Sequence, residues 1–577
     1  VEAIGGTLAA VPLAGPQWNR LLIERRWRAL APGHELLVEV ETRYQNLAVG
    51  RRANQYSLYG DGQAAADFPD PYTVAPRAHF WMGQHPNPQR ILVLGGGAEG
   101  LLAEILRHPV EHVDYVEPDP RQIDVLAPFL PEADRQALFD PRVTVHHTDG
   151  RHFVKTRTSQ YDLVLARLPE PTSALRARFY TAEFYSELRR AMGPRSVLCL
   201  TAAATPTRLS DASARYLASL RATLRTCFPE VAVGWGEPAQ VLAATTGSLL
   251  TGDGAVLARR YQQRGVESPW FDPLWFEGAT DWLESHKVSQ RAAELDTATG
   301  VQVSTDLRPI VYMQRLALWE RMVGGQTGLW IERLLAVTWK PVAALLAAAG
   351  GMILLGWRIG CRSPAGWGRG AIVLSVATTG FATMALSLVW LFAFQNLYGY
   401  VYQRIGWIIA LFMAGLVVGC AWTDRQARRI NDPPRLAAYL WSRLIGVDLL
   451  LAALSLGVPI ILPALGAMQT TAASLVFVEW SVSLLVLATG TLGGAAFALA
   501  GGLQLGMTGR PGPAAGIVVA ADHAGACLGA LLTGVLLVPV LGIATTAVIL
   551  AAMKLASAGT LAGGRRLDRT TTAAPCT

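Results

Sequence analysis

The sequence has little charge for its length and no cysteine pattern that suits a metal. Only 16% of its 577 residues are charged, and its six cysteines show no CxxC or comparable ligand spacing. We therefore expect buried thiols and no metal. Residues 1–18 lack the basic stretch and long apolar run of a secretory signal. Many arginines lie in short loops between apolar runs, so we expect no nucleic acid as a partner.

Long apolar segments dominate the C-terminal part of the sequence. We count seven from residue 334 onward: 334–357, 370–394, 403–422, 440–463, 473–503, 514–538 and 541–560. Each is long enough to cross about 30 Å of hydrocarbon. The overlong fifth segment is glycine-rich at 490–494, so we expect it to tilt or break. The sequence predicts an all-α membrane domain of about seven helices at 334–562 and a polar tail at 563–577.

The arginines of this part are concentrated in alternate loops. They occur in 358–369, in 423–439 and in the tail, whereas 464–472 has none. With seven spans the arginine-rich side is cytoplasmic, and the preceding soluble part is outside. If the number of spans differs by one, the soluble part lies on the cytoplasmic side instead. We therefore expect an integral protein of the inner or cell membrane, with the lipid bilayer as a partner and the side of the soluble part open.

Several ionisable residues lie within the apolar segments and are candidates for function. Glu479, Asp522 and His523 lie deepest, where they could line a polar path or pair with one another. A buried hydrogen bond between helices is an equally good interpretation. Lys340 and Asp448 lie nearer to the ends, where we expect them to reach the interface or cap a helix.

Strand-like and helix-like segments alternate in the middle of the sequence. The strand-like segments are ILVL (91–94), HVDYVE (112–117), VTVHHTDG (143–150), YDLVLA (161–166) and SVLCLTAA (196–203). This alternation predicts a Rossmann-like (methyltransferase-like) α/β parallel sheet, in a domain that we place at 91–330. In the lead-in, 1–90, the β-prone stretches 36–42 and 44–50 and a following Asp-Gly turn predict a small β-hairpin subdomain.

A glycine-rich turn follows the first strand of this pattern. ILVLGGGAEG (91–100) presents backbone N–H groups and a helix start to a ligand. Glu117 ends the next strand, where an acid can bind ribose hydroxyls, and Asp149 and Gly150 end the third, where an acid can reach an adenine amine. One nucleoside would use all three features; the alternative is a set of ordinary turn residues.

Residues 36–245 resemble the spermidine and spermine synthases, the polyamine aminopropyltransferases. The matching motifs are RYQNLAVG (43–50), SLYGDGQ (57–63), DPY (70–72), the run 91–120, DPRVTVHHTDGRHF (140–153), YDLVLARLPEP (161–171) and FYTAEFY (179–185). The resemblance implies a membrane-bound spermidine-synthase-like transferase of polyamine metabolism. Its co-substrate would be decarboxylated S-adenosylmethionine or a related adenosyl nucleoside, without a metal, and its acceptor a small amine or another molecule. A homo-oligomer is left open.

The same resemblance implies roles for individual residues. This family moves an aminopropyl group from a sulfonium to an amine, so acids bind the substrates and one takes a proton. The residues matched to the nucleoside are Gln45, Gly95, Gly96, Gly97, Glu99, Glu117, Asp149 and Gly150. Those matched to the amine channel are Gln63, Asp70, Tyr72, Tyr180 and Tyr185. Hydrophobic packing explains the three tyrosines equally well.

Three positions depart from the family pattern. Ala98 replaces the acid of GGGDG, and residues 74–76 replace Tyr-His-Glu. In ARLPEP, Arg167 replaces the usual base and the second acid is kept as Glu170, so these two are the catalytic candidates. Because an arginine repels a cationic amine, the pattern favours a neutral or anionic acceptor. A non-catalytic sensor or scaffold of a membrane complex, a transporter with a regulatory nucleoside-binding domain, and a methyltransferase are the alternatives.

Overall fold

The computed structural model describes residues 21–202, 204, 210–233, 238–279, 290–291, 294, 301–322, 364–398, 402–468 and 472–572. The chain divides into two compact units that interleave along the sequence. The first unit comprises Val1–Pro169, Glu187–Leu209 and Leu224–Arg291, and the second comprises Glu170–Ser186, Ser210–Thr223 and Ala292–Thr577. The predicted span 334–357 and Lys340 lie outside the described residues.

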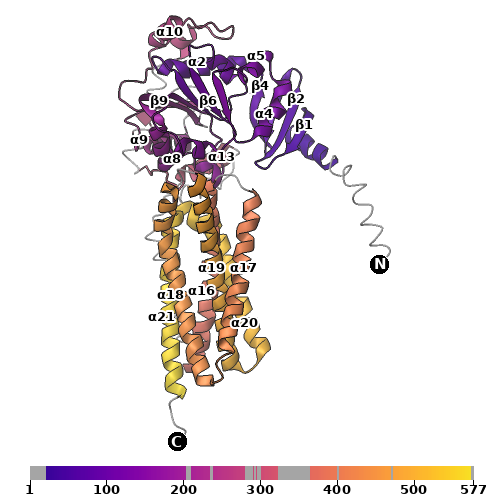
Figure 1. The fold of residues 1–577 in the computed structure, drawn as a ribbon, viewed down its shortest axis with the longest axis vertical. Coiled ribbons are helices and arrows are strands. Elements are labelled where there is room, and N and C mark those ends of the chain that lie inside the picture. Colours follow the sequence, from indigo (N-terminus) through magenta and orange to yellow (C-terminus); the bar gives the residue numbers. More distant parts are fainter. Residues whose placement is uncertain are drawn as a thin grey trace, which may run out of the picture. The chain divides into compact units, whose positions relative to one another are not determined.

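A four-stranded antiparallel sheet begins the first unit (Figure 1). Its strands are neighbours in both sequence and space: β1 (Glu35–Glu41), β2 (Asn46–Arg52), β3 (Gln55–Gly60) and β4 (Gln63–Phe68). Asp61 and Gly62 both have positive φ and connect β3 to β4, as expected for an Asp-Gly hairpin turn. One face buries Leu47, Val49 and Leu58, which confirms the predicted β subdomain.

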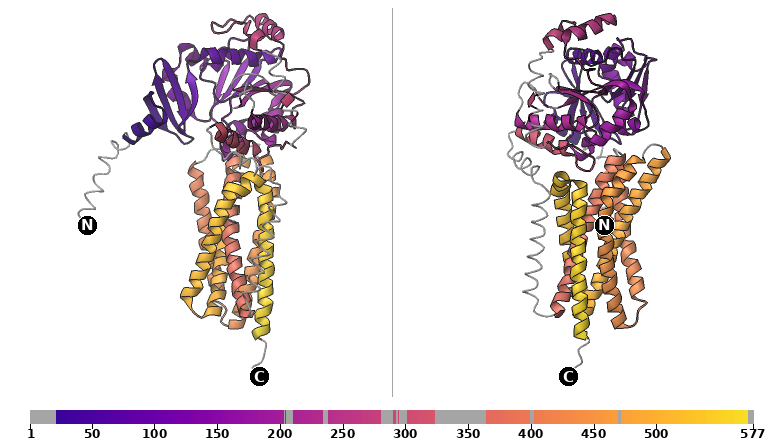
Figure 2. Two further views of the ribbon diagram at one scale, coloured as in Figure 1. Left: turned by 180° about the vertical axis from the view of Figure 1, so that it is seen from behind. Right: turned by 90° about the vertical axis from the view of Figure 1, so that its left-hand side faces the viewer.

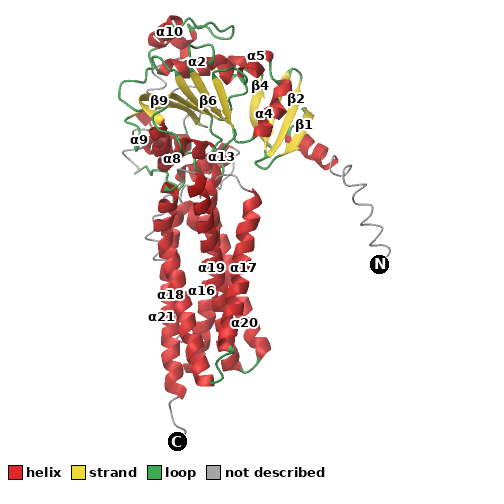
Figure 3. Ribbon diagram, in the orientation of Figure 1, coloured by secondary structure: helices red, strands yellow, loops and turns green. Residues whose placement is uncertain are grey.

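The centre of the first unit is a seven-stranded sheet in the order β10-β11-β9-β8-β5-β6-β7 (Figure 3). The strands are β5 (Arg90–Leu94), β6 (His112–Val116), β7 (Val143–His146), β8 (Tyr161–Ala166), β9 (Met192–Ala202), β10 (Glu230–Val233) and β11 (Ala239–Ala244). Strands β5 to β9 are parallel, which confirms the predicted Rossmann-like sheet. The antiparallel pair β10 and β11 at one edge was not predicted.

Short helices connect the strands. Between residues 71 and 322 they are α2 (Pro71–Gln84), α3 (Leu101–Ile105), α4 (Pro120–Leu126), the 3₁₀ helix η1 (Ala127–Phe129), α5 (Glu132–Ala137), α6 (Gly150–Lys155), α7 (Ala174–Ala177), α8 (Ala182–Ala191), α9 (Asp211–Arg225), α10 (Gly254–Gln263), α11 (Trp275–Ala279) and α13 (Ile310–Met322). Strand β5 is apolar on both faces and buried after its first residue, as a central parallel strand requires. Its carboxyl end therefore delivers the glycine turn, Gly95–Gly97, to the ligand-binding edge of the sheet.

Long helices make up most of the second unit and run side by side (Figure 2). They are α16 (Pro364–Tyr398), α17 (Tyr402–Ala427), α18 (Pro433–Ala467), α19 (Ala472–Thr508), α20 (Pro511–Leu532), the π-helix η3 (Thr533–Leu541) and α21 (Gly542–Thr572). Within the described residues, five stretches are long and apolar enough to cross a membrane, so seven spans are not confirmed. The fifth, Pro511–Arg566, merges two predicted spans and changes direction at Gly542, where φ is +83°.

The glycines at 490–494 let two helices approach closely. Helix α19 continues through them, so the expected break does not occur. A Cβ atom at Gly494 would lie 2.0 Å from the carbonyl oxygen of Leu416 on α17, and one at Gly490 would lie 2.2 Å from that of Phe412. Small residues thus permit the backbone contact that drives association of membrane helices.

The arginine-rich segments gather at one end of the helix bundle. Gln504 Nε2 donates to the carbonyl of Arg369 (3.0 Å), and Gly564 packs against Trp441, so α16, α18, α19 and α21 each have one end here. At the other end, Asn396 Nδ2 donates to the Asp306 carbonyl (3.3 Å), and Ile543 N–H donates to the Leu307 carbonyl (2.7 Å). Residues 305–308 are therefore fastened to the arginine-poor end.

Candidate functional site

The glycine turn is covered by the side chain of Arg167. Arg167 directly follows β8, the neighbour of β5, so its side chain reaches the turn from the adjacent strand. Its Nη1 donates to the carbonyl of Gly96 (2.8 Å). A Cβ atom at Gly96 would lie 2.9 Å from Arg167 Nε, and the φ of Gly96 is +56°. Glycine is therefore required here both by the backbone conformation and by the guanidinium.

Glu99 provides a buried carboxylate beside this guanidinium. It is only 4% exposed, and its Oε2 lies 3.6 Å from Arg167 Nη1. Oε2 accepts no hydrogen bond from the part of the chain that the structure describes. Ala98, which replaces the family's acid, is packed in the hydrophobic core. The carboxylate at this turn thus belongs to Glu99, one residue later than in the family pattern.

A second arginine adds positive charge near the turn. Burial and, to a smaller extent, the charge of Arg167 lower the pKa of Arg77, on α2, to about 10, and Asp70 opposes the change. Arg77 and Arg167, the arginine pair, are therefore like charges that repel each other in a poorly solvated space. Arg77 could not be predicted as part of the site, because its position on α2 gives no sign of a partner that follows β8.

Glu117 lies buried where β6 ends, as the nucleoside hypothesis requires. Gln122 Nε2 donates to its Oε2 (3.0 Å), and Asp119 N–H donates to its Oε1 (3.3 Å). Burial, together with the nearby charge of Glu99, raises the pKa of Glu117 to about 8. Gln45 Nε2 donates to Gln122 Oε1 (3.1 Å), so Gln45 is linked to the same acid through one side chain. The structure thus brings Gln45, Glu99 and Glu117 together with the glycine turn.

Asp149 and Gly150 lie beyond the end of β7, next to β6. Asp149 is the N-cap of α6, and its Oδ1 accepts from His152 N–H (3.0 Å). His147 Nδ1 lies 3.1 Å from the carbonyl oxygen of Glu117, so the ends of the two strands are joined. Gly150 is buried as the first residue of α6. This placement agrees with the predicted adenine side of the site, which itself stays a prediction.

The residues matched to the amine channel are more scattered. Gln63 is an exposed residue at the start of β4, and Asp70 caps α2 by accepting from Thr73 N–H (3.3 Å). Tyr72 is 75% exposed and packs edge-on against Trp270. None of these contacts joins Gln63 or Tyr72 to the glycine turn, so their substrate roles stay predictions.

Glu170, Tyr180 and Tyr185 belong to the second unit. Glu170 Oε2 accepts from Nε of Arg315, on α13, at 3.0 Å. Tyr180 and Tyr185 are buried, and burial together with neighbouring tyrosines and Glu170 raises the pKa of Tyr180 well above its usual value. Arg315 was missed by the sequence analysis, since 145 residues separate it from its partner.

The same unit fastens the family motif FYTAEFY to residues 305–308. Thr181 Oγ1 donates to Asp306 Oδ1 (2.8 Å), and Asp306 N–H donates to Glu183 Oε2 (2.9 Å). Ala182 N–H donates to the carbonyl of Ser304 (2.9 Å). The motif is thus hydrogen-bonded to the segment that also holds Asn396 and Ile543 of the long helices.

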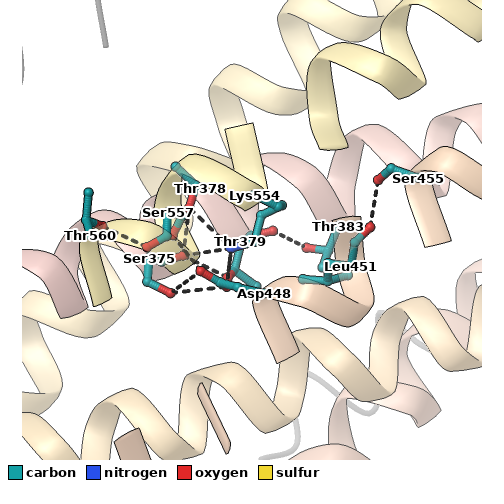
Figure 4. A network of polar contacts seen from close by, with 10 residues as sticks. All are labelled: Ser375, Thr378, Thr379, Thr383, Asp448, Leu451, Ser455, Lys554, Ser557 and Thr560. Atoms are coloured by element: carbon teal, nitrogen blue, oxygen red, sulfur yellow. Dashed lines mark hydrogen bonds and ion pairs between the residues drawn. The ribbon is translucent and has the colours of Figure 1, made fainter. Parts of the chain in front are cut away.

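The helix bundle contains a buried polar network around Asp448 and Lys554 (Figure 4). Both side chains have no exposed surface and form an ion pair between α18 and α21. Lys554 Nζ also donates to Thr379 Oγ1 (2.9 Å), and Ser557 Oγ donates to Asp448 Oδ2 (2.6 Å). Ser375 Oγ completes the shell at 3.2 Å from each carboxylate oxygen. The expectation that Asp448 extends toward the interface is wrong, because Lys554, which the sequence analysis omitted, neutralises it inside the bundle.

The other ionisable candidates of the long helices lie on α19 and α20. Asp522 Oδ2 lies 3.9 Å from Nδ1 of His523, whose side chain is mostly exposed on α20. Glu479 is half-buried on α19. Across the described ranges of the chain, no group of three His, Cys, Asp or Glu residues is arranged to hold a metal ion.

Comparison with known proteins gives a family for the central part of the chain. Residues 77–234 match the family model of the spermine/spermidine synthase domain. This part of the chain is therefore similar to the spermine/spermidine synthase domain.

Curated relatives agree with this match. A polyamine aminopropyltransferase of Nitrosomonas europaea is 37% identical over 147 residues, which cover 25% of this chain and 45% of the relative. Polyamine aminopropyltransferase 2 of Ralstonia nicotianae is 32% identical over 193 residues, covering 32% and 37%. The chain thus spans less than half the length of these relatives. The crystal structure of spermidine synthase from Thermotoga maritima is 17% identical, with a TM-score of 0.37, over 45% of this chain and 87% of that one.

Proposed function

We propose that this protein is a membrane-bound, spermidine-synthase-like transferase that binds an S-adenosyl-type nucleoside and transfers an aminopropyl or related group to an acceptor. The observation that carries the proposal is the grouping of Glu117, Glu99 and the glycine turn at adjacent strand ends, inside the segment that matches the family. Parallel α/β sheets bind nucleotides at this edge. The long apolar helices support a location in the inner or cell membrane.

Each residue of this edge has a definite task in the proposal. Glu117 binds the ribose hydroxyls, and Asp149 binds the adenine amine. Gln45 acts on the nucleoside through Gln122, which already contacts Glu117. In the second unit, Glu170 is the acid that remains for the acceptor or its proton, and Arg315 holds its carboxylate in place.

Calorimetry on the full chain in lipid nanodiscs tests this proposal. Methylthioadenosine is the probe, because it contains the adenine, the ribose and the sulfur shared by all S-adenosyl ligands. We expect binding that is weakened at least about tenfold in Glu117→Ala and Asp149→Ala, since each loses a hydrogen-bond partner of the nucleoside. Glu132→Ala removes an exposed carboxylate of the same unit and is the matched control. Absence of binding to the folded wild type would refute a nucleoside site.

A non-catalytic sensor is the second candidate, and the position of Arg167 favours it. The guanidinium lies where the family has a general base, and it cannot take a proton from an acceptor amine. Incubation of the full chain with labelled decarboxylated S-adenosylmethionine and a set of amines separates the two candidates. Release of methylthioadenosine that depends on an amine supports the transferase, whereas tight binding without release supports the sensor.

A further inference from the structure

The charged side chains around the glycine turn suit a zwitterionic ligand better than a simple cation. Arg167 offers guanidinium N–H donors over Gly96, with Arg77 as a second positive charge nearby. Beside them, Glu99 keeps one buried carboxylate oxygen that accepts no hydrogen bond within the described residues. A buried acceptor without a donor is unfavourable, so a ligand that donates a hydrogen bond to this oxygen gains affinity.

We propose that Arg167, Arg77 and Glu99 bind the α-amino acid head group of an S-adenosyl ligand that has kept its carboxylate. The arginine pair takes the carboxylate, and Glu99 takes the ammonium. The inference rests on the proposed nucleoside site and names its ligand as S-adenosylmethionine rather than the decarboxylated form.

Charge balance distinguishes the two ligands. Decarboxylated S-adenosylmethionine offers an ammonium and a sulfonium but nothing for the arginine pair, and its cations add to the repulsion between Arg77 and Arg167. A carboxylate removes that repulsion and makes charge-assisted hydrogen bonds to a guanidinium. The distance of 3.6 Å between Glu99 Oε2 and Arg167 Nη1 exceeds that of a direct hydrogen bond, so both groups keep capacity for a ligand.

The position of Arg167 assigns this carboxylate to the nucleoside ligand rather than to an acceptor. The guanidinium is bonded to Gly96 itself, at the carboxyl end of β5 and immediately before α3. Nucleotide ligands of such sheets lie over this turn. Glu117 follows β6, which pairs with β5, the strand that leads into the turn. A ligand whose sugar is bound by Glu117 therefore has its other end close to the turn.

Calorimetric titration of the full chain in nanodiscs with three ligands tests the inference. Methylthioadenosine reports on the shared nucleoside part, decarboxylated S-adenosylmethionine adds the ammonium, and S-adenosylmethionine adds the carboxylate. We expect the wild type to bind S-adenosylmethionine about ten- to hundredfold more tightly than the decarboxylated ligand. Arg167→Gln and Arg77→Gln should remove this preference. Glu99→Gln should weaken both amine-bearing ligands and spare methylthioadenosine.

The control and the contrary outcomes are distinct. Arg142→Gln removes an arginine that pairs with Asp140 away from the turn and should leave all three affinities unchanged. Unaltered methylthioadenosine binding shows that each variant is folded at the site. If the decarboxylated ligand binds as tightly as S-adenosylmethionine, or if Arg167→Gln leaves the preference intact, the inference is wrong while the nucleoside site stands. If the wild type binds none of the three ligands, the proposed function itself fails.

Discussion

The helix bundle and the glycine turn each bury a carboxylate beside a cation, and they do so differently. In the helix bundle, Asp448 accepts from Lys554 and two serines, so both of its oxygens are satisfied. At the glycine turn, Glu99 lies 3.6 Å from Arg167 and keeps one oxygen without a hydrogen bond among the described residues. A complete network fixes how helices pack, whereas an incomplete one has capacity left for a ligand. The bundle pair is thus a structural charge pair, whereas the glycine turn has the features expected of the proposed ligand site.

The largest effect is expected where the complete network loses one partner. Asp448→Ala leaves Lys554 buried without a counter-charge, which should lower the free energy of unfolding of the full chain by about 3–5 kcal/mol. Denaturant titration in detergent micelles, followed by tryptophan fluorescence, measures this loss. Asp424→Ala is the matched control, because Asp424 and Arg428 form an exposed pair on α17 and just beyond it, worth at most about 1 kcal/mol.

The double variant Asp448→Leu with Lys554→Met sharpens the same comparison. Apolar side chains of similar size avoid the cost of burying charge, so most of the lost stability should return. A double variant as unstable as Asp448→Ala would mean that the pair has a role other than packing.

The next effect concerns the pH dependence contributed by Glu117. The folded protein raises the pKa of this acid from 4.5 to about 8, so the folded state holds its proton more tightly than the unfolded state. Its contribution to stability is therefore largest below pH 4.5 and falls as the pH rises to about 8. Glu117→Gln should flatten this fall, which thermal unfolding at pH 5.5 and pH 8.5 measures for both proteins. If the wild type and Glu117→Gln lost the same stability between pH 5.5 and pH 8.5, the raised pKa of Glu117 would be contradicted.

A smaller effect is expected from Gly96→Ala. The added Cβ atom meets the guanidinium of Arg167 and places a non-glycine residue at positive φ, so we expect a loss of about 1–3 kcal/mol in unfolding free energy. Gly252→Ala is the control, since nothing lies within 4 Å of its Cβ position. The combination with Arg167→Ala should recover the part of the loss that comes from the clash.

The smallest effect is expected from Tyr72→Ala. This side chain is mostly exposed and touches Trp270 by its edge, so its removal should change the unfolding free energy by less than about 0.5 kcal/mol. A larger loss, measured by the same denaturant titration, would show that Tyr72 belongs to a packed site and not to the open surface.

Local signals in the sequence were sufficient for the strands and for one edge of the site. The apolar runs before the glycines and around residue 163 match β5 and β8 closely, because buried parallel strands are continuously apolar. The predicted ends of two further strands, β6 and β7, then place Glu117 and Asp149 without further information. The approach of Arg167 to Gly96 could not be predicted, because it depends on β8 lying next to β5.

The helix bundle shows the limit of sequence reasoning more clearly. Hydropathy located the long helices but not their number, since the apolar stretch after residue 511 turns only at Gly542. The partners Asp448 and Lys554 are separated by about a hundred residues and three helix connections. A periodic pattern describes which face of a helix is apolar but gives no register between helices.

Within the second unit, residues 305–308 connect the family motif to the long helices by hydrogen bonds. On one side they are bonded to Thr181 and Glu183 of the family motif, and on the other to Asn396 and to Ile543, next to the reversal at Gly542. The motif and the ends of α16 and α21 therefore share one anchor within the second unit.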